Sequence, residues 1–350
     1  MNAYELIKPF ELEKVDFFLE QILPERNLKF GEVVVGMMSG KGDANFLLIW
    51  EAFKGSLLYG LSESRYLFVT MILYGVIASV LQAATGIFKG KQAMQLAKYF
   101  ILLLVSLILM HGFDAAQEIC TSTVMNVSDF MKVILPVLCM SLGVSHGTLS
   151  AYGYYQFMFL VIYVLGQILL RLFLPLTRCY LLLVFMNAIS DEKRFEGIVN
   201  LLEKGVGNGL KLLASLLLGG GFVRSVLLAK VDHVGRTMVG KAVGAVPVVG
   251  DVSDSATQML LSCADLVKSC MGGGALVALV IVCSMPLLRL FVLFASLHLS
   301  SAFVGLVGEK RTMHMLQQAG KGFFMLFQIA FFTVLVFALT ITMMLRLSTG

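Results

Sequence analysis

Ionisable side chains inside an apolar region are the residues of this chain best suited to chemistry. Four charged side chains lie in residues 250–269, and a fifth lies between two uncharged runs further along the chain. Charges at membrane depth are costly and commonly mark a path for ions or substrates. Together with two nearby prolines they form our candidate polar path or gate: Pro247, Asp251, Asp254, Asp265, Lys268, Pro286 and Arg289.

Most of these charges also have a purely structural explanation. Asp251 is suited to cap a helix N-terminus, and Asp254 three residues later suits the same free N–H groups. Asp265 and Lys268 are spaced i,i+3 and can pair on one helix. Arg289 has no such simple account, because long apolar runs flank it on both sides. We expect it to face the bundle interior and to pair with Asp265 or Asp254.

Small residues and a proline near these charges predict an unusual packing arrangement. Small side chains allow helices to approach closely within a membrane. Pro247 interrupts residues 229–270, and broken backbone at membrane depth must be buried in protein or line a wet cavity. We therefore expect a re-entrant hairpin there. The packing candidates are two glycine triplets: Gly219, Gly220, Gly221, Gly272, Gly273 and Gly274.

No sequence pattern indicates an enzyme. Two glycine-rich stretches, MSGKGDA at residues 38–44 and GVGNGLK at 205–211, lack the phosphate-loop spacing and are expected to be turns. The HExxH and GxSxG motifs are absent, the five histidines are far apart, and the six cysteines include no CxxC pair. We expect no catalytic residue, no cofactor and no metal site.

Composition places the chain among integral membrane proteins. Of its 350 residues, 58% are hydrophobic and only 14% are charged, and the mean hydropathy is +0.87. A soluble domain typically carries about 25% charged residues. The net charge of +5 does not indicate nucleic acid, because basic residues in a membrane protein mostly mark cytoplasmic loops.

The uncharged runs predict an all-α polytopic fold with seven or eight transmembrane helices. A transmembrane helix needs about 20 mostly apolar residues. We expect one long helix over about residues 275–299, bent by Pro286 and followed by a partly inserted tail. The other expected spans are residues 66–88, 99–113, two within 133–170, then 172–190, 212–228 and 322–345.

Charge also predicts the organisation around these spans. Residues 1–64 form an amphipathic N-terminal region with an interfacial helix at 44–61, followed by a membrane domain at 65–346. Residues 191–208 are expected to form a cytoplasmic interfacial helix. Lysines and arginines gather near residues 89–98, 193–194 and 310–321, whereas the expected loop at 114–132 is mainly acidic. This pattern favours an extracytoplasmic N-terminal region and C-terminus.

A stretch within this order of elements resembles a known family. Residues 228–269, LAKVDHVGRTMVGKAVGAVPVVGDVSDSATQMLLSCADLVKS, continue through a glycine entry to the next apolar run. This combination is similar to the stage III sporulation protein AE family, and ILPERNLKFGEVVVGMMSGK near the N-terminus extends the resemblance over most of the chain.

The resemblance implies a non-enzymatic component of a transenvelope channel or secretion complex for endospore development. Its expected location is the mother-cell membrane around the forespore. The implied partners are sibling proteins of the same operon, including a separate ATPase and ring-forming membrane proteins, and through them a forespore-side partner. The alternative is an independent secondary transporter that uses the intramembrane charges, as broken helices near the membrane midplane do in transporters.

Overall fold

The computed structural model is all-helical over the residues that it describes. These are residues 10, 12–22, 29–38, 91–146, 148–190, 194–216, 250–306 and 310–346, with single positions between 50 and 80. No strand occurs among them. The helices are α2 (Glu13–Ile22), α3 (Phe30–Met38), α5 (Lys91–His146), α6 (Thr148–Ile168), the π-helix η3 (Leu169–Phe173), α7 (Leu174–Ile189), a helix over residues 196–216, α9 (Gly250–Leu306) and α10 (Lys310–Arg346).

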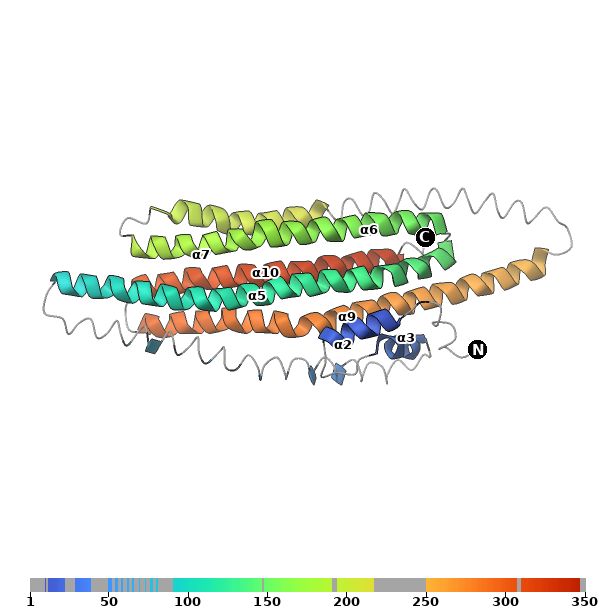
Figure 1. Cartoon of the computed structure of the whole chain (residues 1–350), viewed down its shortest axis with the longest axis horizontal. Coiled ribbons are helices and arrows are strands. Elements are labelled where there is room, and N and C mark those ends of the chain that lie inside the picture. Colours follow the sequence, from blue (N-terminus) through green and yellow to red (C-terminus); the bar gives the residue numbers. More distant parts are fainter. Residues whose placement is uncertain are drawn as a thin grey trace.

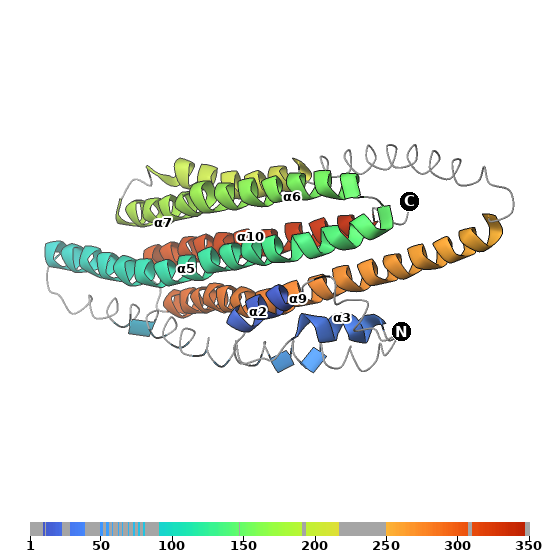
Figure 2. The same cartoon turned by 45° about the vertical axis from the view of Figure 1, so that its right-hand side comes forward.

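The long helices lie side by side along one axis (Figure 1). α5 and α10 run in the same direction, whereas α6–α7 and α9 run in the opposite direction. The helix over residues 196–216 lies on α7, and the two short helices α2 and α3 lie beside α9, as the turned view also shows (Figure 2). The basic residues near 91–98, 194 and 310–321 therefore gather at one end of the bundle.

Four of these helices are long and apolar enough to cross a membrane by length and composition: Gln92–Ser141, Met158–Ile189, Leu266–Gly305 and Lys310–Met343. The chain is thus a helical membrane protein, but the expected count of seven or eight spans is not confirmed. Some segments that we expected to be separate are joined, and most of each span expected at residues 66–88 and 212–228 lies outside the described residues. At 1.5 Å per residue, the 56 residues of α5 extend over roughly 84 Å, more than twice the hydrocarbon thickness of a bilayer.

The expected loop after the second span is wrong, because residues 114–132 lie inside α5. Its acids recur on one exposed side of the helix while the opposite side is buried. Asp129 and Lys132 support the helix as an i,i+3 ion pair at 2.7 Å. Charge alone suggested a loop, yet a helix tolerates charges when they share one face.

The two spans expected around Arg171 are likewise one continuous helical run over residues 148–189. Pro175 has no N–H to donate to the carbonyl of Arg171, so the regular i→i−4 pattern cannot be kept there. The helix widens instead, and the N–H of Leu174 donates to the carbonyl of Leu169. The resulting π-helix η3 keeps the chain helical through the proline.

The helix over residues 196–216 also runs through a predicted turn. GVGNGLK at 205–211 is helical, so the expectation of a turn there is wrong. A Cβ on Gly209 would lie 2.9 Å from Cζ of Phe173 in η3, whereas one on Gly205 would meet nothing within 4 Å. Gly209 therefore permits the close approach of this helix to η3, and its function is packing.

Aromatic side chains form much of the contact between the helices. Phe113 of α5 meets Phe323 of α10 edge to face, with ring centroids 5.3 Å apart. A row of phenylalanines joins α9 to α10: Phe291, Phe294, Phe324, Phe327 and Phe331. Such pairs add about 0.5–1.5 kcal/mol each beyond the area that they bury.

The two short N-terminal helices pack on the bundle. Phe18 of α2 lies 6.2 Å from Phe130 of α5, measured between ring centroids. The Asp16 carboxylate accepts a hydrogen bond from the N–H of Phe30, the first residue of α3. This contact caps α3 and fixes its angle to α2. Most of the interfacial helix expected at residues 44–61 lies outside the described residues.

Candidate functional site

The predicted polar residues that the structure describes all lie on α9. Pro286 and Arg289 are half-buried in the middle of this helix, and Lys268 is buried with 2% of its surface exposed. The side chains of Asp251, Asp254 and Asp265 are outside the described part of the chain. Pro247 and the glycines Gly219, Gly220 and Gly221 also lie outside it.

The expected pairing of Arg289 with Asp265 or Asp254 is wrong for a single chain. α9 continues without a break from Gly250 to Leu306. Arg289 is 24 residues from Asp265 and 35 from Asp254, which separates their backbones by roughly 36 and 52 Å at 1.5 Å per residue. The expectation required the chain to turn back near Gly272–Gly274, and the helix passes straight through these glycines.

The second glycine triplet sits where three segments meet. A Cβ on Gly272 would overlap the side chain of Leu345 at the end of α10. On Gly273 it would lie 3.3 Å from Sδ of Met37, and on Gly274 it would lie 3.1 Å from Cγ2 of Val34. The triplet thus permits close approach of α3 and α10 to α9. Of the hairpin expected over residues 229–270, residues 229–249 lie outside the described part of the chain, and residues 250–270 belong to α9.

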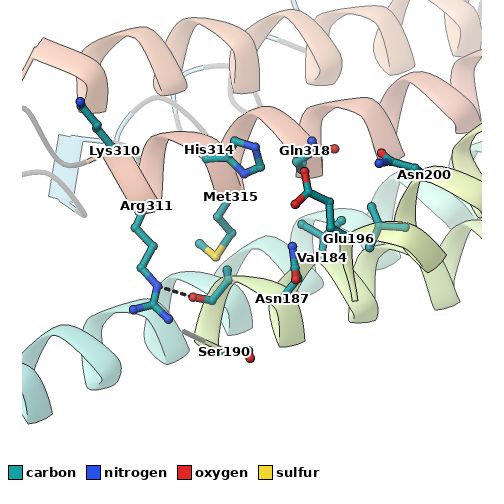
Figure 3. Close-up of a pocket in the computed structure, with 12 residues that line it drawn as sticks. Val184, Asn187, Ser190, Glu196, Asn200, Lys310, Arg311, His314, Met315 and Gln318 are labelled. Carbon is teal, nitrogen blue, oxygen red and sulfur yellow. Dashed lines mark hydrogen bonds between the residues drawn. The ribbon is translucent and has the colours of Figure 1, made fainter. Parts of the chain in front are cut away.

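A cavity that we did not predict, lined by both polar and apolar side chains, lies at the basic end of the bundle (Figure 3). It has a volume of about 360 Å³ between α7, the helix over residues 196–216 and the start of α10. Its walls carry hydrogen-bond donors and acceptors, and they include side chains of positive and of negative charge. The lining residues are Val184, Asn187, Ala188, Ser190, Glu196, Val199, Asn200, Lys310, Arg311, His314, Met315 and Gln318.

Arg311 holds the helices around this cavity together. Its Nε donates to the carbonyl of Ala188 at 2.5 Å, and its Nη2 donates to that of Ile189 at 2.6 Å. These carbonyls end α7, where a cation also suits the negative end of the helix dipole. The guanidinium carbon lies 5.4 Å from the ring centroid of Tyr99. One side chain therefore joins α5, α7 and α10.

Two further polar links extend from the cavity into the bundle. The hydroxyl of Tyr180 lies 3.0 Å from both the backbone and the side-chain carbonyl oxygens of Gln318, so it donates to Gln318. Lys321 pairs with Glu203 at 3.0 Å. Residues 191–208 and 310–321 were expected to be separate cytoplasmic segments, because helical periodicity alone does not show that the two segments meet.

A second polar feature lies on the outside of α5. We call it the α5–α7 polar face, and it consists of Asp114, Glu118, Ser122, Asp129, Lys132 and Arg178. All six side chains are exposed. Asp114 of α5 pairs with Arg178 of α7 at 3.1 Å. The five members of this face on α5 are spaced three, four or seven residues apart, which is typical of one side of a helix. We missed this signal because we assigned these residues to a loop.

The residues around these features do not suggest a metal centre. Among the described residues, no three histidine, cysteine, aspartate or glutamate side chains gather closely enough to hold a metal ion. The cavity instead combines amides, a histidine and charges of both signs. Such side chains can bind polar groups through hydrogen bonds and ion pairs.

Comparison with known proteins identifies a similar sequence. Stage III sporulation protein AE of Bacillus subtilis (strain 168) is 20% identical over 277 residues, which cover 79% of this chain and 69% of that protein. No solved structure matches the chain. The model of the family described as "Stage III sporulation protein AE" matches residues 28–348. The match includes both the basic-end cavity and α9, and the chain belongs to the stage III sporulation protein AE family.

Proposed function

We propose that this protein is a non-enzymatic membrane component of a channel or specialised secretion complex required for endospore development. Its membership of a sporulation family over residues 28–348 is the observation that carries the proposal. The four membrane-spanning candidates support an integral component. The proposed location is the mother-cell membrane around the forespore.

The proposal includes partners on the basic side of the bundle. Basic loops favour the cytoplasmic side of a membrane, so the end with Lys310 and Arg311 would face the mother-cell cytoplasm. The cavity of about 360 Å³ at that end offers charged and amide groups for a partner side chain. A separate ATPase and ring-forming proteins of the same operon are the partners that we propose, since the energy for transport would come from outside this chain.

The proposal is tested by replacing the only gene copy with variants of two α9 residues. We expect Asp265→Asn and Arg289→Gln to leave membrane levels of the protein unchanged on immunoblots while forespore development stalls after engulfment. The matched control is Lys204→Gln, which removes an exposed charge from the helix over residues 196–216. Normal sporulation of a strain that lacks the gene would refute the function. Normal sporulation of both α9 variants would refute only the role of these two residues.

The transporter alternative finds no support in the described residues. It depended on the intramembrane charges and on a broken segment around Pro247, which lies outside the described residues; transporters use such discontinuous helices at their substrate sites. α9 is continuous from Gly250 through Arg289. Within α9, therefore, no break supplies free backbone groups beside Lys268 or Arg289 for substrate or ion coordination.

A further inference from the structure

The depth of the α5–α7 polar face follows from its packing against α10. Residues 322–345 of α10 are a long uncharged run in the sequence, so they mark the level of the hydrocarbon core. α5 runs parallel to α10 (Figure 1). Two contacts fix their register: the Phe113 ring meets the Phe323 ring, and Cys120 Sγ lies 3.4 Å from the carbonyl of Leu326.

This register places the polar face at membrane depth. Glu118, Ser122, Asp129 and Lys132 lie level with the uncharged run of α10, and the Asp114–Arg178 pair lies at its edge. The paired residues are still accessible, since the side chains of Asp114 and Arg178 are 46% and 49% exposed, and those of Asp129 and Lys132 are 52% and 42% exposed. Charged groups at this depth strongly disfavour contact with lipid.

Another side of the bundle has the surface that lipid requires. At the same depth, the most exposed side chains of α9 and α10 are all large and apolar. They are Val280, Phe291, Phe324, Phe331 and Leu335. The two faces therefore have different surroundings. The apolar face suits acyl chains, and the α5–α7 polar face requires protein against it.

The charge pattern of the polar face fits a second copy of itself. Each charged pair places an acid and a base at nearly the same depth, Asp114 beside Arg178 and Asp129 beside Lys132. Copies related by an axis along the bilayer normal keep their depth, so the acid of one copy can meet the base of the other. The face has three acids and two bases, so its net charge is close to zero. Such a face suits association with a second copy of itself better than association with a partner that carries a strong charge of one sign.

We propose that the α5–α7 polar face is the interface between two copies of this chain in the membrane. The inference rests on the membrane placement that belongs to the proposed function. In the assembly, Ser122 lies near the centre of the contact and the Asp114–Arg178 pairs of the two copies lie next to each other at one edge.

Cysteine cross-linking in membranes from sporulating cells tests this interface. The parent carries Cys179→Ser, which removes the exposed cysteine beside Arg178. Into it we introduce Ser122→Cys on the polar face or, as the matched control, Phe331→Cys on the apolar face. With a short thiol-reactive cross-linker, we expect Ser122→Cys to give an adduct of twice the 38.3 kDa chain mass, at least five-fold more abundant than with Phe331→Cys or the parent.

Three outcomes would overturn the proposal. The adduct could form equally with Phe331→Cys, it could have a mass that indicates a different protein, or it could fail to form while Ser122→Cys reacts with a water-soluble maleimide. The last result would mean that the face lines water. Sporulation of the same strains is measured in parallel, so that loss of the interface is distinguished from failure of the proposed function.

A charge exchange tests the electrostatic part of the inference. In the Ser122→Cys background, Asp114→Arg places two cations side by side at the edge of the contact, and we expect the adduct to fall at least five-fold. Adding Arg178→Asp restores opposite charges at the same depth and should restore the adduct. Equal adduct in all three strains, with equal protein levels, would show that these charges do not form the interface.

Discussion

Arg311 shows how much a single side chain can hold together in this protein. It bonds the last carbonyls of α7 and lies over the ring of Tyr99, so three helices depend on it. Lysine keeps the positive charge but cannot present the planar fork that reaches two carbonyls at once. The contribution of Arg311 is therefore geometric as well as electrostatic.

We expect Arg311→Lys to destabilise the purified protein by about 1–2 kcal/mol, because a hydrogen bond from a charged donor is lost at a partly exposed site. Thermal unfolding in detergent measures the effect. Lys310→Gln, at the exposed neighbouring position, is the control and should leave the unfolding temperature unchanged. Equal unfolding temperatures for Arg311→Lys and the parent would contradict the bridging role.

Asp16 gives a pH-dependent prediction. Burial raises the pKa of this carboxyl above 3.8, while hydrogen bonds from the N–H groups of Phe30 and Gly31 oppose the rise. The folded state therefore holds the proton more tightly than the unfolded chain. The stability that protonation contributes is complete below the unfolded pKa and is lost as pH rises through the folded pKa.

We therefore expect Asp16→Asn to be more stable than the parent at pH 7, since the amide keeps an acceptor for the N–H of Phe30 without a buried charge. The advantage should shrink as the pH falls through the folded-state pKa of Asp16, where the parent carboxyl gains its proton. Asp16→Ala lacks the acceptor and should be less stable at every pH. Unfolding temperatures measured in detergent across this range check the prediction, and a pH-independent difference for Asp16→Asn would disprove it.

At the scale of helices, close approach at glycine decides how the helix over residues 196–216 packs. A methyl group at Gly209 would press on the Phe173 ring, and overpacking of this kind costs about 1–3 kcal/mol. We expect Gly209→Ala to lower the unfolding temperature. Gly205→Ala, where a Cβ meets nothing, should raise it slightly because alanine favours the helix by up to about 1 kcal/mol. The same sign for both variants would refute this packing account.

The sequence could predict the helical class and the apolar segments, and it predicted a continuous helix through Arg289. It could not predict where helices end. Pro175 should interrupt a helix, yet the π-helix η3 keeps the chain helical there. The acids of α5 suggested a loop, although they lie on one face of a helix. Helix ends in a bundle depend on tertiary contacts that outweigh local signals. The cavity was missed for a related reason, since its walls come from segments more than 100 residues apart.

At the scale of the whole molecule, the bundle is longer than a membrane is thick. If residues 322–345 of α10 mark the hydrocarbon level, the start of α5 lies outside it on the basic side. We expect Leu96→Cys in the Cys179→Ser background to react with a water-soluble maleimide, and Phe331→Cys to be protected. Labelling of Leu96→Cys only in inside-out vesicles would support a cytoplasmic basic end. Labelling only in intact spheroplasts would reverse the orientation.

The contacts between α5 and α10 also determine when, during synthesis, α5 can complete its packing. Phe113 packs on Phe323, so 210 residues must be synthesised after Phe113 before its partner exists. At 5–20 residues per second that interval is roughly 10–40 s. During that interval α5 lacks its contacts with α10, while α6 and later α9 can already pack against other parts of it. A chain that stops before residue 323 would leave the part of α5 around Phe113 without its partner, so synthesis of α10 is the step that completes the packing around α5.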